Sequence, residues 1–376
     1  MRIALIIGSE KAGGSENQML LLARGLLNSG HKVTVIFTDH DNCRFRRNPD
    51  SVLDFSGIDR IKLSMRRFYR IFYLPYGRLR IRLKKFDIAL ACGMNNSCIM
   101  NALFKNSRTK TVCRLSNLYF ADPAEKTEKN KAIAAVSAAD AVISNANIAL
   151  DSALTMRILP PEKPHKVIRN AVICHDPVND PQPGRFHVLF VGKLQPVKDP
   201  ETLLKALVIA RKRIPELTGE FIGYGSLAGR MQKCITENDW AGFIRITGFV
   251  PQSQIPYNQA DLLVNCSVSE LSSGAIAEAL YRGIIVVASN VGGNPELLAN
   301  REFGALFPVG DAEACAEEII KFALKTPAER RKIAEQAKKF AVESFSPENY
   351  IKSYLALFEK MLEDDVSGTP ESKKVQ

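Results

Sequence analysis

Two glutamates and a run of small polar residues are the clearest chemical signal in the second half of the chain. Seven residues separate Glu270 from Glu278; Glu270 follows the apolar run 261–267, and a helix is expected to begin around Ser272, Ser273 and Gly274. Backbone N–H groups at a helix N-terminus bind anions such as a diphosphate, and a carboxylate accepts hydrogen bonds from sugar hydroxyls. The spacing is equally compatible with Glu270 capping the helix and Glu278 lying on a solvated face.

Two cations are expected at the same edge of the sheet. Lys193 and Lys198 follow the apolar run 187–192 and precede a helix that starts at Pro200. A loop in this position would let both ammonium groups neutralise phosphate oxygens. Taken alone, two lysines in a loop are better explained as solvated charges.

The elements that would position these residues follow a β–α rhythm that occurs twice. Strands are predicted at 3–7, 32–37, 87–91, 111–115 and 141–144, and then at 187–192, 220–225, 243–248, 261–267 and 284–289. Short apolar strands that alternate with helices predict parallel sheets covered on both faces, an α/β fold. Residues 174–185 contain three prolines and a glycine, which is typical of a linker. The predicted parts are a first domain at 1–177, a linker at 178–185, a second domain at 186–345, a C-terminal helix at 346–363 that crosses back to the first domain, and a disordered tail at 364–376.

The order of these motifs resembles a known family. The segments GKL…VKDPETLLKAL, IGYGSL, TGFVPQSQIPYNQADLLVNCS, Glu270-x7-Glu278 and VASNVGGNPELL, with GGSENQMLLLARGLLNSGHKVTVIF near the start, resemble family 4 glycosyltransferases of the GT-B fold. The similarity covers roughly residues 1–345. It implies two Rossmann-like, doubly wound domains that face each other across a cleft.

The resemblance also implies roles for individual residues. Glu278 matches the residue that binds the ribose hydroxyls of a nucleotide-sugar, and Glu270 matches the one that holds the donor sugar beside the backbone of Ser272, Ser273 and Gly274. Lys193 and Lys198 match the pair that neutralises the departing diphosphate, which makes Glu270 and the two lysines the candidate catalytic residues. The remaining matches are Phe249 and Val250, whose backbone would contact the nucleobase, and Gly13 and Gly14, which would approach the donor from the other domain.

The sequence departs from the family pattern at three places. Family members often carry a histidine where this chain reads TVCRLSN, so Ser116 and Asn117 occupy its position. We expect Arg114 and Asn117 to bind acceptor or sugar instead. Lys193 stands where arginine is commoner, and the RNAVICHD segment lacks the glycine of the family's interdomain motif.

The implied activity is that of a retaining, metal-independent hexosyltransferase without a cofactor. It would move a sugar from a UDP-linked donor to a lipid-linked or growing cell-surface polysaccharide, such as lipopolysaccharide. One alternative is a catalytically degenerate relative that binds nucleotide or glycan as a scaffold. Another is a NAD-dependent oxidoreductase, because IGYGSLA satisfies G-x-G-x-x-A, although the acidic residue needed about twenty positions later is missing. Asp39, His40 and Asp41 form a DxD triplet that we interpret as a turn.

The net charge of +11 comes mainly from one segment. Ten Lys or Arg and no Asp or Glu lie between Arg60 and Phe86, so the rest of the chain carries about +1. The spacing predicts an amphipathic helix around 65–73, broken by Pro75 and Gly77; residues 78–84 alternate like a strand, although the family favours a helix there. A basic, aromatic segment suits the surface of an anionic membrane. The alternatives are a helix packed on its own sheet with solvated arginines, and RNA binding, although no nucleic-acid motif accompanies the charge.

Cysteine usage and hydropathy predict a cytoplasmic protein that does not span a membrane. The location that we expect for it, if the basic segment binds lipid, is the inner face of the cytoplasmic membrane. The eight cysteines are scattered without CxxC pairs, which is typical of reduced, buried thiols. The apolar run near the start is too short for a signal-peptide core, and no stretch reaches about eighteen apolar residues.

Overall fold

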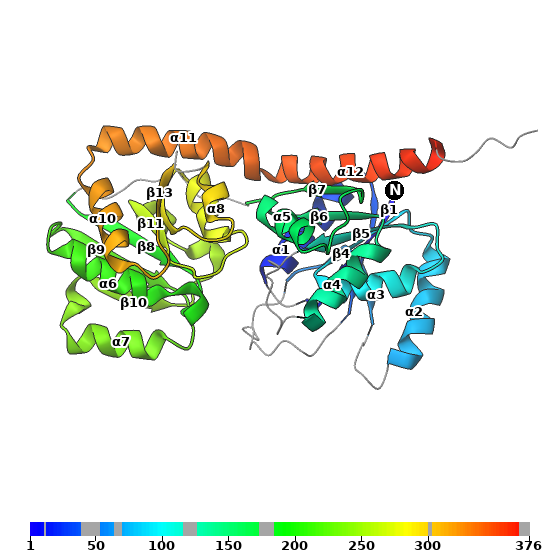
Figure 1. Cartoon of the computed structure of the whole chain (residues 1–376), viewed down its shortest axis with the longest axis horizontal. Coiled ribbons are helices and arrows are strands. Elements are labelled where there is room, and N and C mark those ends of the chain that lie inside the picture. The colour runs from blue at the N-terminus through cyan, green and yellow to red at the C-terminus, as the bar shows by residue number, and fades with distance from the viewer. Residues whose placement is uncertain are drawn as a thin grey trace, which may run out of the picture. The chain divides into compact units, whose positions relative to one another are not determined.

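The computed structural model of the chain describes residues 1–10, 13–38, 53–63, 70–115, 126–172, 184–299 and 303–367. Two compact units make up the structure, and the chain passes between them twice (Figure 1). The first unit comprises Met1–Ala171 with Pro347–Gln376, and the second comprises Val172–Ser346. The first crossing therefore comes six residues before the boundary predicted at 177. Most of the predicted linker, 178–183, lies outside the described residues.

The described strands of the first unit form a seven-stranded parallel sheet. Their order is β3-β2-β1-β4-β5-β6-β7. They are β1 (Arg2–Ile7), β2 (Lys32–Phe37), β3 (Asp59–Lys62), β4 (Ile88–Cys92), β5 (Lys110–Leu115), β6 (Ala141–Ser144) and β7 (His165–Val167). The central strands are apolar on both faces because helices cover both, as the short apolar runs predicted. The short edge strands β3 and β7 escaped the sequence analysis, because their composition is largely polar and basic.

Helices of the first unit cover the two faces of this sheet unequally. They are α1 (Gly14–Asn28), α2 (Arg70–Lys84), α3 (Met94–Phe104), α4 (Lys126–Ala138), α5 (Asn147–Thr155) and α12 (Pro347–Ser367). One face packs against α1 and α12, and Leu22, Tyr354 and Leu5 of β1 belong to the same buried core. The other face packs against α2, α3, α4 and α5 (Figure 1).

The helix α2 corrects one prediction about the basic segment. It runs without interruption through Pro75 and Gly77 to Lys84, so these residues do not break it. Residues 78–84 are helical, as the family pattern indicated, and not a strand. The Gly77 position lacks a side chain where a Cβ would lie 3.1 Å from Leu103 of α3, which lets the two helices pack closely. Residues 64–69, which include most of the predicted helix at 65–73, lie outside the described part.

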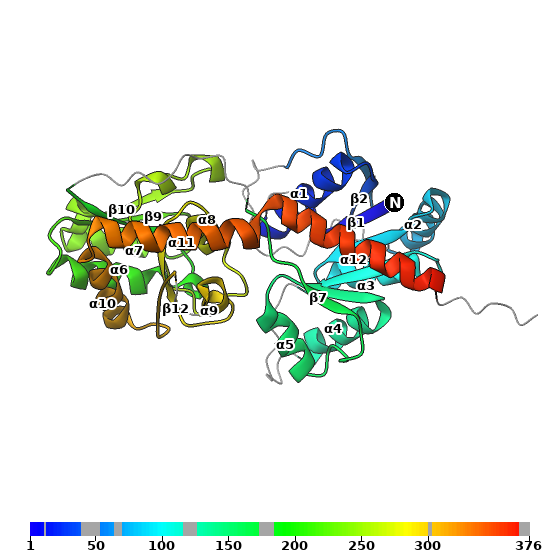
Figure 2. The same cartoon turned by 90° about the horizontal axis from the view of Figure 1, so that it is seen from above.

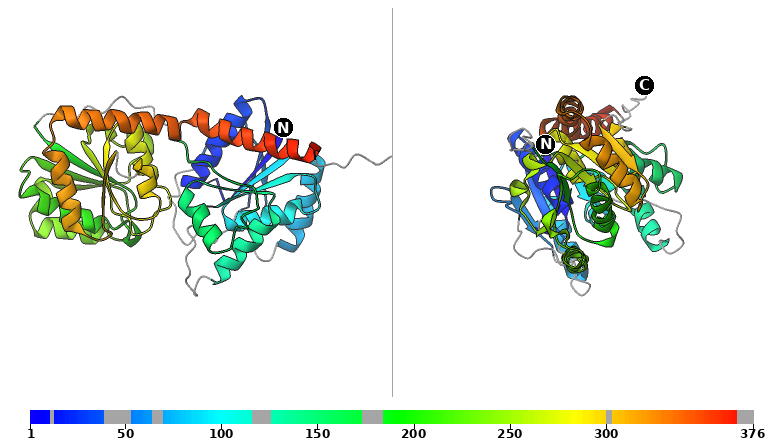
Figure 3. Two further views of the ribbon diagram at one scale, coloured as in Figure 1. Left: turned by 45° about the horizontal axis from the view of Figure 1, so that its top comes forward. Right: turned by 90° about the vertical axis from the view of Figure 1, so that its left-hand side faces the viewer.

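The second unit repeats the plan with six parallel strands. Their order is β10-β9-β8-β11-β12-β13. They are β8 (Phe186–Val191), β9 (Leu217–Ile222), β10 (Ile244–Gly248), β11 (Leu262–Asn265), β12 (Ile285–Ser289) and β13 (Gly304–Phe307). The helices are α6 (Pro200–Arg211), α7 (Ala228–Glu237), α8 (Gly274–Tyr281), α9 (Asn294–Leu297), α10 (Ala312–Ala323) and α11 (Pro327–Phe345). Helices α6, α7 and α10 cover one face, with α6 beside α10 (Figure 3), and α8, α9 and α11 cover the other.

The last helix belongs to the first unit. Ser346 separates α11 from α12, and α12 lies along α1 (Figure 2). Tyr350, Tyr354 and Phe358, at successive four-residue intervals, are buried against the first sheet. The helix continues to Ser367, so the disordered tail predicted from 364 is wrong for residues 364–367. The rest of that tail is outside the described residues.

Two chemical features follow from the fold. The six cysteines in the described ranges are free thiols, and Cys92, Cys113, Cys266 and Cys315 are buried. Burial raises the pKa of the Cys113 thiol to about 12. None of the described helices combines the length and apolar composition that a membrane span requires.

Candidate functional site

The predicted site residues of the second unit gather where its strand order reverses. β8 lies between β9 and β11, so the loops after β8 and β11 diverge at the carboxyl edge of the sheet. Open α/β sheets bind ligands in the crevice that such a reversal creates. Here the backbone N–H of Val268, after β11, donates to the carbonyl of Val197, after β8, over 3.0 Å. This bond joins the two loops.

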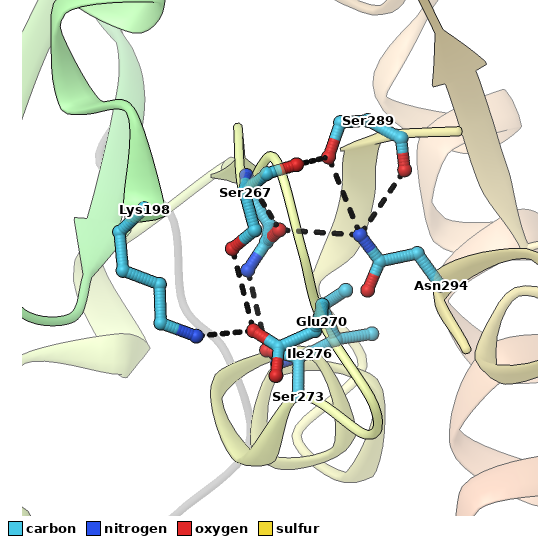
Figure 4. A network of polar contacts seen from close by, with 8 residues as sticks. Lys198, Ser267, Glu270, Ser273, Ile276, Ser289 and Asn294 are labelled. Carbon is cyan, nitrogen blue, oxygen red and sulfur yellow. Dashed lines mark hydrogen bonds and ion pairs between the residues drawn. The ribbon is translucent and has the colours of Figure 1, made fainter. Parts of the chain in front are cut away.

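Lys198 and Glu270 form an ion pair across the crevice (Figure 4). Lys198 ends the 3₁₀ turn Pro196–Lys198, and its ammonium group donates to Oε2 of Glu270. The hydroxyl of Ser267 is 3.3 Å from the same oxygen. The Glu270 side chain is 11% exposed and that of Lys198 is 28% exposed. Both side chains are therefore largely shielded from water but still accessible to a ligand. The ion pair holds the Lys198 ammonium group in the crevice, where it could bind an anionic ligand.

The start of α8 is capped by Ser273 and not by Glu270. The Ser273 hydroxyl accepts a hydrogen bond from the backbone N–H of Ile276 over 3.4 Å, and the Asn265 amide donates to it over 3.3 Å. This is the usual serine cap, which satisfies one of the open N–H groups of the first turn. Because Ser273 caps the helix, the Glu270 carboxylate is available for its contacts with Lys198 and Ser267. The alternative in which Glu270 caps the helix is wrong.

Glu278 is held by two neutral donors from the loop before β11. The Gln252 side-chain amide donates to Oε1 over 2.7 Å, and the Tyr257 hydroxyl donates to Oε2 over 2.9 Å. The Tyr257 ring is fully buried, and the guanidinium carbon of Arg282 lies 4.4 Å from its centroid. Arg282 also donates to the backbone carbonyl of Glu278 over 3.2 Å. The carboxylate is therefore oriented, and does not lie free on a solvated helix face.

These side chains line one cavity of about 250 Å³ within the second unit. Its lining includes Lys198, Glu270, Gln252, Tyr257 and Glu278. Gly192, Ser273 and Gly274 also border it. Carboxylates, an ammonium group and a helix N-terminus converge there, a combination that suits a ligand with both phosphate and hydroxyl groups.

Sequence reasoning missed Gln252, Tyr257 and Arg282. Gln252 and Tyr257 lie in the segment PQSQIPYNQ, which has no periodicity and no charge pattern, and Arg282 lies at the end of α8. The one available signal was an aromatic residue within a polar, proline-containing loop. Such a residue is usually buried against something specific.

A glycine turn after β12 packs against the backbone of the loop that carries Glu270. Gly292 has a φ of +54°, and a Cβ there would lie 1.7 Å from the carbonyl oxygen of Glu270. The N–H of Gly293 donates to that carbonyl over 3.1 Å. The fully buried Asn294 donates to Oδ1 of Asn265 over 3.2 Å and to the carbonyl of Ser289 over 3.1 Å (Figure 4). The VGGN turn therefore positions the loop that carries Glu270.

The glycines of IGYGSLA serve packing in the same way. A Cβ at Gly223 would lie 1.8 Å from the carbonyl oxygen of Gly192, and one at Gly225 would lie 2.1 Å from that of Leu194. The loops after β8 and β9 thus lie backbone against backbone. This contact accounts for both glycines without a dinucleotide.

The other predicted residues of this unit lie at the same sheet edge. Lys193 is exposed in the loop after β8. Phe249 follows β10 and is 52% exposed, and its ring centroid lies 5.9 Å from that of Tyr224 after β9. Val250 is half-buried next to Phe249. Their contacts with a nucleobase or phosphate stay predictions.

The first unit holds the remaining predicted residues. Gly13 caps α1 and Gly14 begins it, with open space around the Gly14 Cβ position. Asn117 lies outside the described residues. Arg114, expected to bind acceptor or sugar, is 3% exposed; its guanidinium donates to Oδ1 of Asn170, and to the Cys92 sulfur over 3.7 Å. A ligand would have to displace these partners, so the geometry gives Arg114 a structural role and does not support the prediction.

Metal ligands do not cluster in the described part of the chain. No group of three or more His, Cys, Asp or Glu residues within the described ranges is placed to hold an ion. The triplet of Asp39, His40 and Asp41 lies outside those ranges.

Both halves of the chain match profiles of glycosyltransferase families. The profile of the family described as "Glycosyltransferase Family 4" matches residues 12–175, and that of "Glycosyl transferases group 1" matches residues 175–340. Among curated relatives, the D-inositol 3-phosphate glycosyltransferase of Paenarthrobacter aurescens is 36% identical over 132 residues, which is 33% of this chain and 32% of that protein. The amylovoran biosynthesis glycosyltransferase AmsK of Erwinia amylovora is 28% identical over 171 residues, 43% of this chain and 40% of that protein. The matches thus span about a third to two fifths of these relatives.

Solved structures resemble the chain over nearly its full length. Anabaena HepE in complex with UDP has a TM-score of 0.78 at 18% identity, covering 96% of this chain and 100% of that one. The lipopolysaccharide outer core galactosyltransferase WaaB, in its apo form, has a TM-score of 0.72 at 17% identity, covering 96% and 100%. At 17–18% sequence identity, this structural similarity is evidence for the fold alone. Together with the two family profiles it shows that the chain belongs to the family 4, group 1 glycosyltransferases, which are two-domain enzymes of the GT-B fold.

Proposed function

We propose that this chain is a hexosyltransferase that uses a UDP-sugar donor, retains the anomeric configuration and needs no metal ion or cofactor. The acceptor is a lipid-linked or growing cell-surface polysaccharide. The enzyme acts in the cytoplasm, at the inner face of the cytoplasmic membrane, where a lipid-linked acceptor is presented. The observation that carries the proposal is the cavity in which Lys198, Glu270, Glu278 and the N-terminus of α8 converge.

The charges of this cavity fit departure of a nucleoside diphosphate. The bond between the sugar C1 and the β-phosphate oxygen breaks, and the acceptor oxygen bonds to C1 on the same face. The acceptor's hydroxyl proton passes to the departing diphosphate. Negative charge grows on that diphosphate, and Lys193, Lys198 and the first N–H groups of α8 would stabilise it.

The two glutamates would take different parts of the donor. Glu278 already accepts two hydrogen bonds from neutral donors and would share its remaining lone pairs with ribose hydroxyls. Glu270 would release part of its contact with Lys198 and accept hydrogen bonds from the transferred sugar. Both relatives quoted above are named as glycosyltransferases, and the HepE structure holds UDP, which supports this donor class.

The test is sugar transfer by the purified chain, screened first for stabilisation by nucleotide-sugars. The Glu270→Ala variant is expected to lose transfer by on the order of 100-fold or more while still binding UDP. The Glu278→Ala variant is expected to weaken UDP binding as well. Transfer that survives both changes overturns the site. UDP binding without any transfer across donors and acceptors would favour the degenerate scaffold.

A further inference from the structure

Buried amide side chains join the ends of two neighbouring strands next to the cavity (Figure 4). Asn265 is the last residue of β11, and Asn294 begins α9, shortly after β12. The Asn294 amide donates to Oδ1 of Asn265 over 3.2 Å and to the carbonyl of Ser289, the last residue of β12, over 3.1 Å. Asn294 is fully buried and Asn265 is 7% exposed. These bonds link β11 to β12 at the carboxyl edge of the sheet, where the cavity lies.

Asn265 is bonded in turn to two separate parts of the site. Its Oδ1 also accepts a hydrogen bond from the backbone N–H of Ser267 over 3.2 Å, and its Nδ2 donates to the Ser273 hydroxyl over 3.3 Å. The Ser267 hydroxyl contacts Oε2 of Glu270, and Ser273 caps α8. One buried amide is therefore connected both to the loop that carries the Glu270 carboxylate and to the helix N-terminus that would bind a diphosphate.

The carboxylate of Glu278 is oriented by a different part of the unit. It accepts hydrogen bonds from Gln252 and Tyr257, which belong to the loop before β11. The bonds that start from Asn294 therefore concern the proposed contacts with the transferred sugar and the diphosphate. The proposed contact with ribose has supports of its own.

We propose that Asn294 is a positioning residue for sugar transfer, which acts through Asn265 to hold Glu270 and the start of α8 in one fixed geometry. Asn265 is the member of the pair that lines the cavity. The inference rests on the proposed transfer reaction, because the sugar and diphosphate contacts are those assigned there. A displacement of about 1 Å between reacting groups costs on the order of 100-fold in rate. Bonds that fix these two elements to each other should therefore affect turnover more than nucleotide affinity.

Transfer kinetics of the full chain separate this role from simple stability. Asn294→Ala removes the amide that links the two strands, and we expect kcat to fall on the order of 100-fold. The affinity for UDP should change by less than about threefold, because Glu278 keeps its two donors. Asn265→Ala is expected to lower kcat to a similar extent. Because the two residues act in series, the double variant should lose no more than about threefold beyond the weaker single variant, whereas independent effects would multiply.

The Asn294→Asp variant adds a rescue test. It keeps the shape of the side chain but replaces the donating nitrogen with an oxygen, which faces two acceptors while the carboxyl group is ionised. Protonation restores one donor, and burial favours the protonated form. We expect kcat, divided by that of the wild type, to be lowest at about pH 8 and to rise roughly tenfold toward about pH 5. Titration of groups that both proteins share cancels in this ratio.

The matched control is Asp261→Ala. Asp261 lies just before β11, at the opposite end of the strand from Asn265, and is likewise 7% exposed. Its Oδ2 accepts a hydrogen bond from the backbone N–H of His187 over 2.8 Å, which links β11 to β8. Loss of this bond is expected to lower the free energy of unfolding and to leave kcat unchanged.

Hydrogen exchange of backbone amides tests the same role without turnover. The N–H groups of Ser267 and Ile276 donate to Oδ1 of Asn265 and to the Ser273 hydroxyl. Asn294→Ala should speed their exchange on the order of tenfold, and Asp261→Ala should leave it unchanged. If the wild-type chain binds UDP but transfers no sugar, the proposed reaction fails, and the exchange rates still decide whether Asn294 holds the two elements.

Four results would overturn the proposal. The first is a folded Asn294→Ala variant whose kcat stays within about threefold of the wild type. The second is an equal loss of kcat in Asp261→Ala, which would make general destabilisation the cause. The third is a double variant in which the two single losses multiply, because Asn294 would then not act through Asn265. The fourth, which decides the matter if Asn294→Ala does not fold, is a pH-independent kcat ratio for Asn294→Asp.

Discussion

At the scale of single residues, the site depends on hydrogen bonds that orient carboxylates. Glu278 lies about one turn into α8, and two side chains from the loop before β11 determine which way its oxygens point. Tyr257 brings its hydroxyl to Oε2 because its ring is buried under Arg282. A carboxylate held in this way loses little side-chain entropy when a ligand binds.

The Tyr257→Phe change tests that orientation. It removes one hydroxyl and keeps the ring and its contact with Arg282. A hydrogen bond to a charged group contributes about 1.5–3 kcal/mol, part of which water would restore in this open cavity. We expect UDP affinity to fall roughly tenfold with little change in unfolding temperature, measured by calorimetry. Unchanged UDP affinity would mean that Tyr257 only fills space.

At the scale of elements, the glycine turn after β12 determines where the loop that carries Glu270 lies. Gly292 combines a φ of +54° with direct contact on the Glu270 backbone, so two physical effects exclude a side chain there. Gly310 has a φ of +77° but nothing within 4 Å of a Cβ. A side chain at Gly310 would therefore cause backbone strain alone. A side chain at Gly292 would cause strain and also displace the Glu270 loop.

The pair Gly292→Ala and Gly310→Ala uses this difference. Gly310→Ala is expected to cost about 1–2 kcal/mol of folding free energy from strain alone, with UDP binding intact. Gly292→Ala should cost more, and it should also lower UDP affinity and transfer, because the Glu270 loop must move. Denaturant unfolding and UDP titration measure the two effects. Equal behaviour of the two variants would contradict the support assigned to the VGGN turn.

A second element-scale feature is a polar cluster across β8, β9 and β10. Glu220 is 1% exposed and accepts a 2.7 Å hydrogen bond from Arg245 and another from Thr247; Nε2 of His187 lies 3.4 Å from its Oε2. Burial alone would raise the pKa of Glu220, but the contacts with His187, Arg245 and Thr247 outweigh it and lower the pKa from 4.5 to about 2.

This lowered pKa predicts acid sensitivity of the second unit. A carboxyl group whose pKa is lower in the folded state stabilises the fold above its unfolded pKa, and the stabilisation disappears as the pH falls. The window therefore runs from about pH 5 down to about pH 2, and the loss is about 3 kcal/mol. Urea unfolding across this range should show a smaller pH effect for Glu220→Gln than for the wild type. Parallel pH curves for both proteins would rule out the assignment.

At the scale of the whole molecule, the chain crosses between two units, each with its own core. α12 belongs to the first unit and completes its core, although it follows the second unit in sequence. Stability of the first sheet therefore depends on residues that lie more than 300 positions after β1 and β2, such as Phe358, which is fully buried. The ligand cavity is built within the second unit alone.

Removing a buried ring from α12 should separate the two units energetically. Phe358→Ala is expected to destabilise the first unit by about 3–5 kcal/mol, the usual cost of an aromatic cavity. Limited proteolysis should then cut the first unit at lower temperature while the second unit stays protected and keeps its affinity for UDP. Phe358→Leu, which leaves a smaller void, serves as the milder control. Simultaneous loss of protection in both units would show that they unfold together.

Much of this protein could be predicted from its sequence because local patterns carry the information. Continuous apolar runs marked β2 and β6 at their observed bounds, since strands buried on both faces need them. Pro200 marked the start of α6 correctly, because proline suits the first helical turn. The Glu270-x7-Glu278 spacing predicted two carboxylates at one strand end, and both line the cavity.

Other features needed the tertiary structure, because contacts between distant segments determine them. Arg114 looked like a ligand-binding residue at the end of a strand, but packing of the first unit buries it beside Asn170. Tyr257 looked like part of a loop, and only the fold brings its hydroxyl to Glu278. The sequence alone determined the alternation of strands and helices and the family, because both are local in the chain. Only the tertiary structure decided which polar side chains are buried together and which leucines of α2 remain exposed, because burial depends on neighbours far away in sequence.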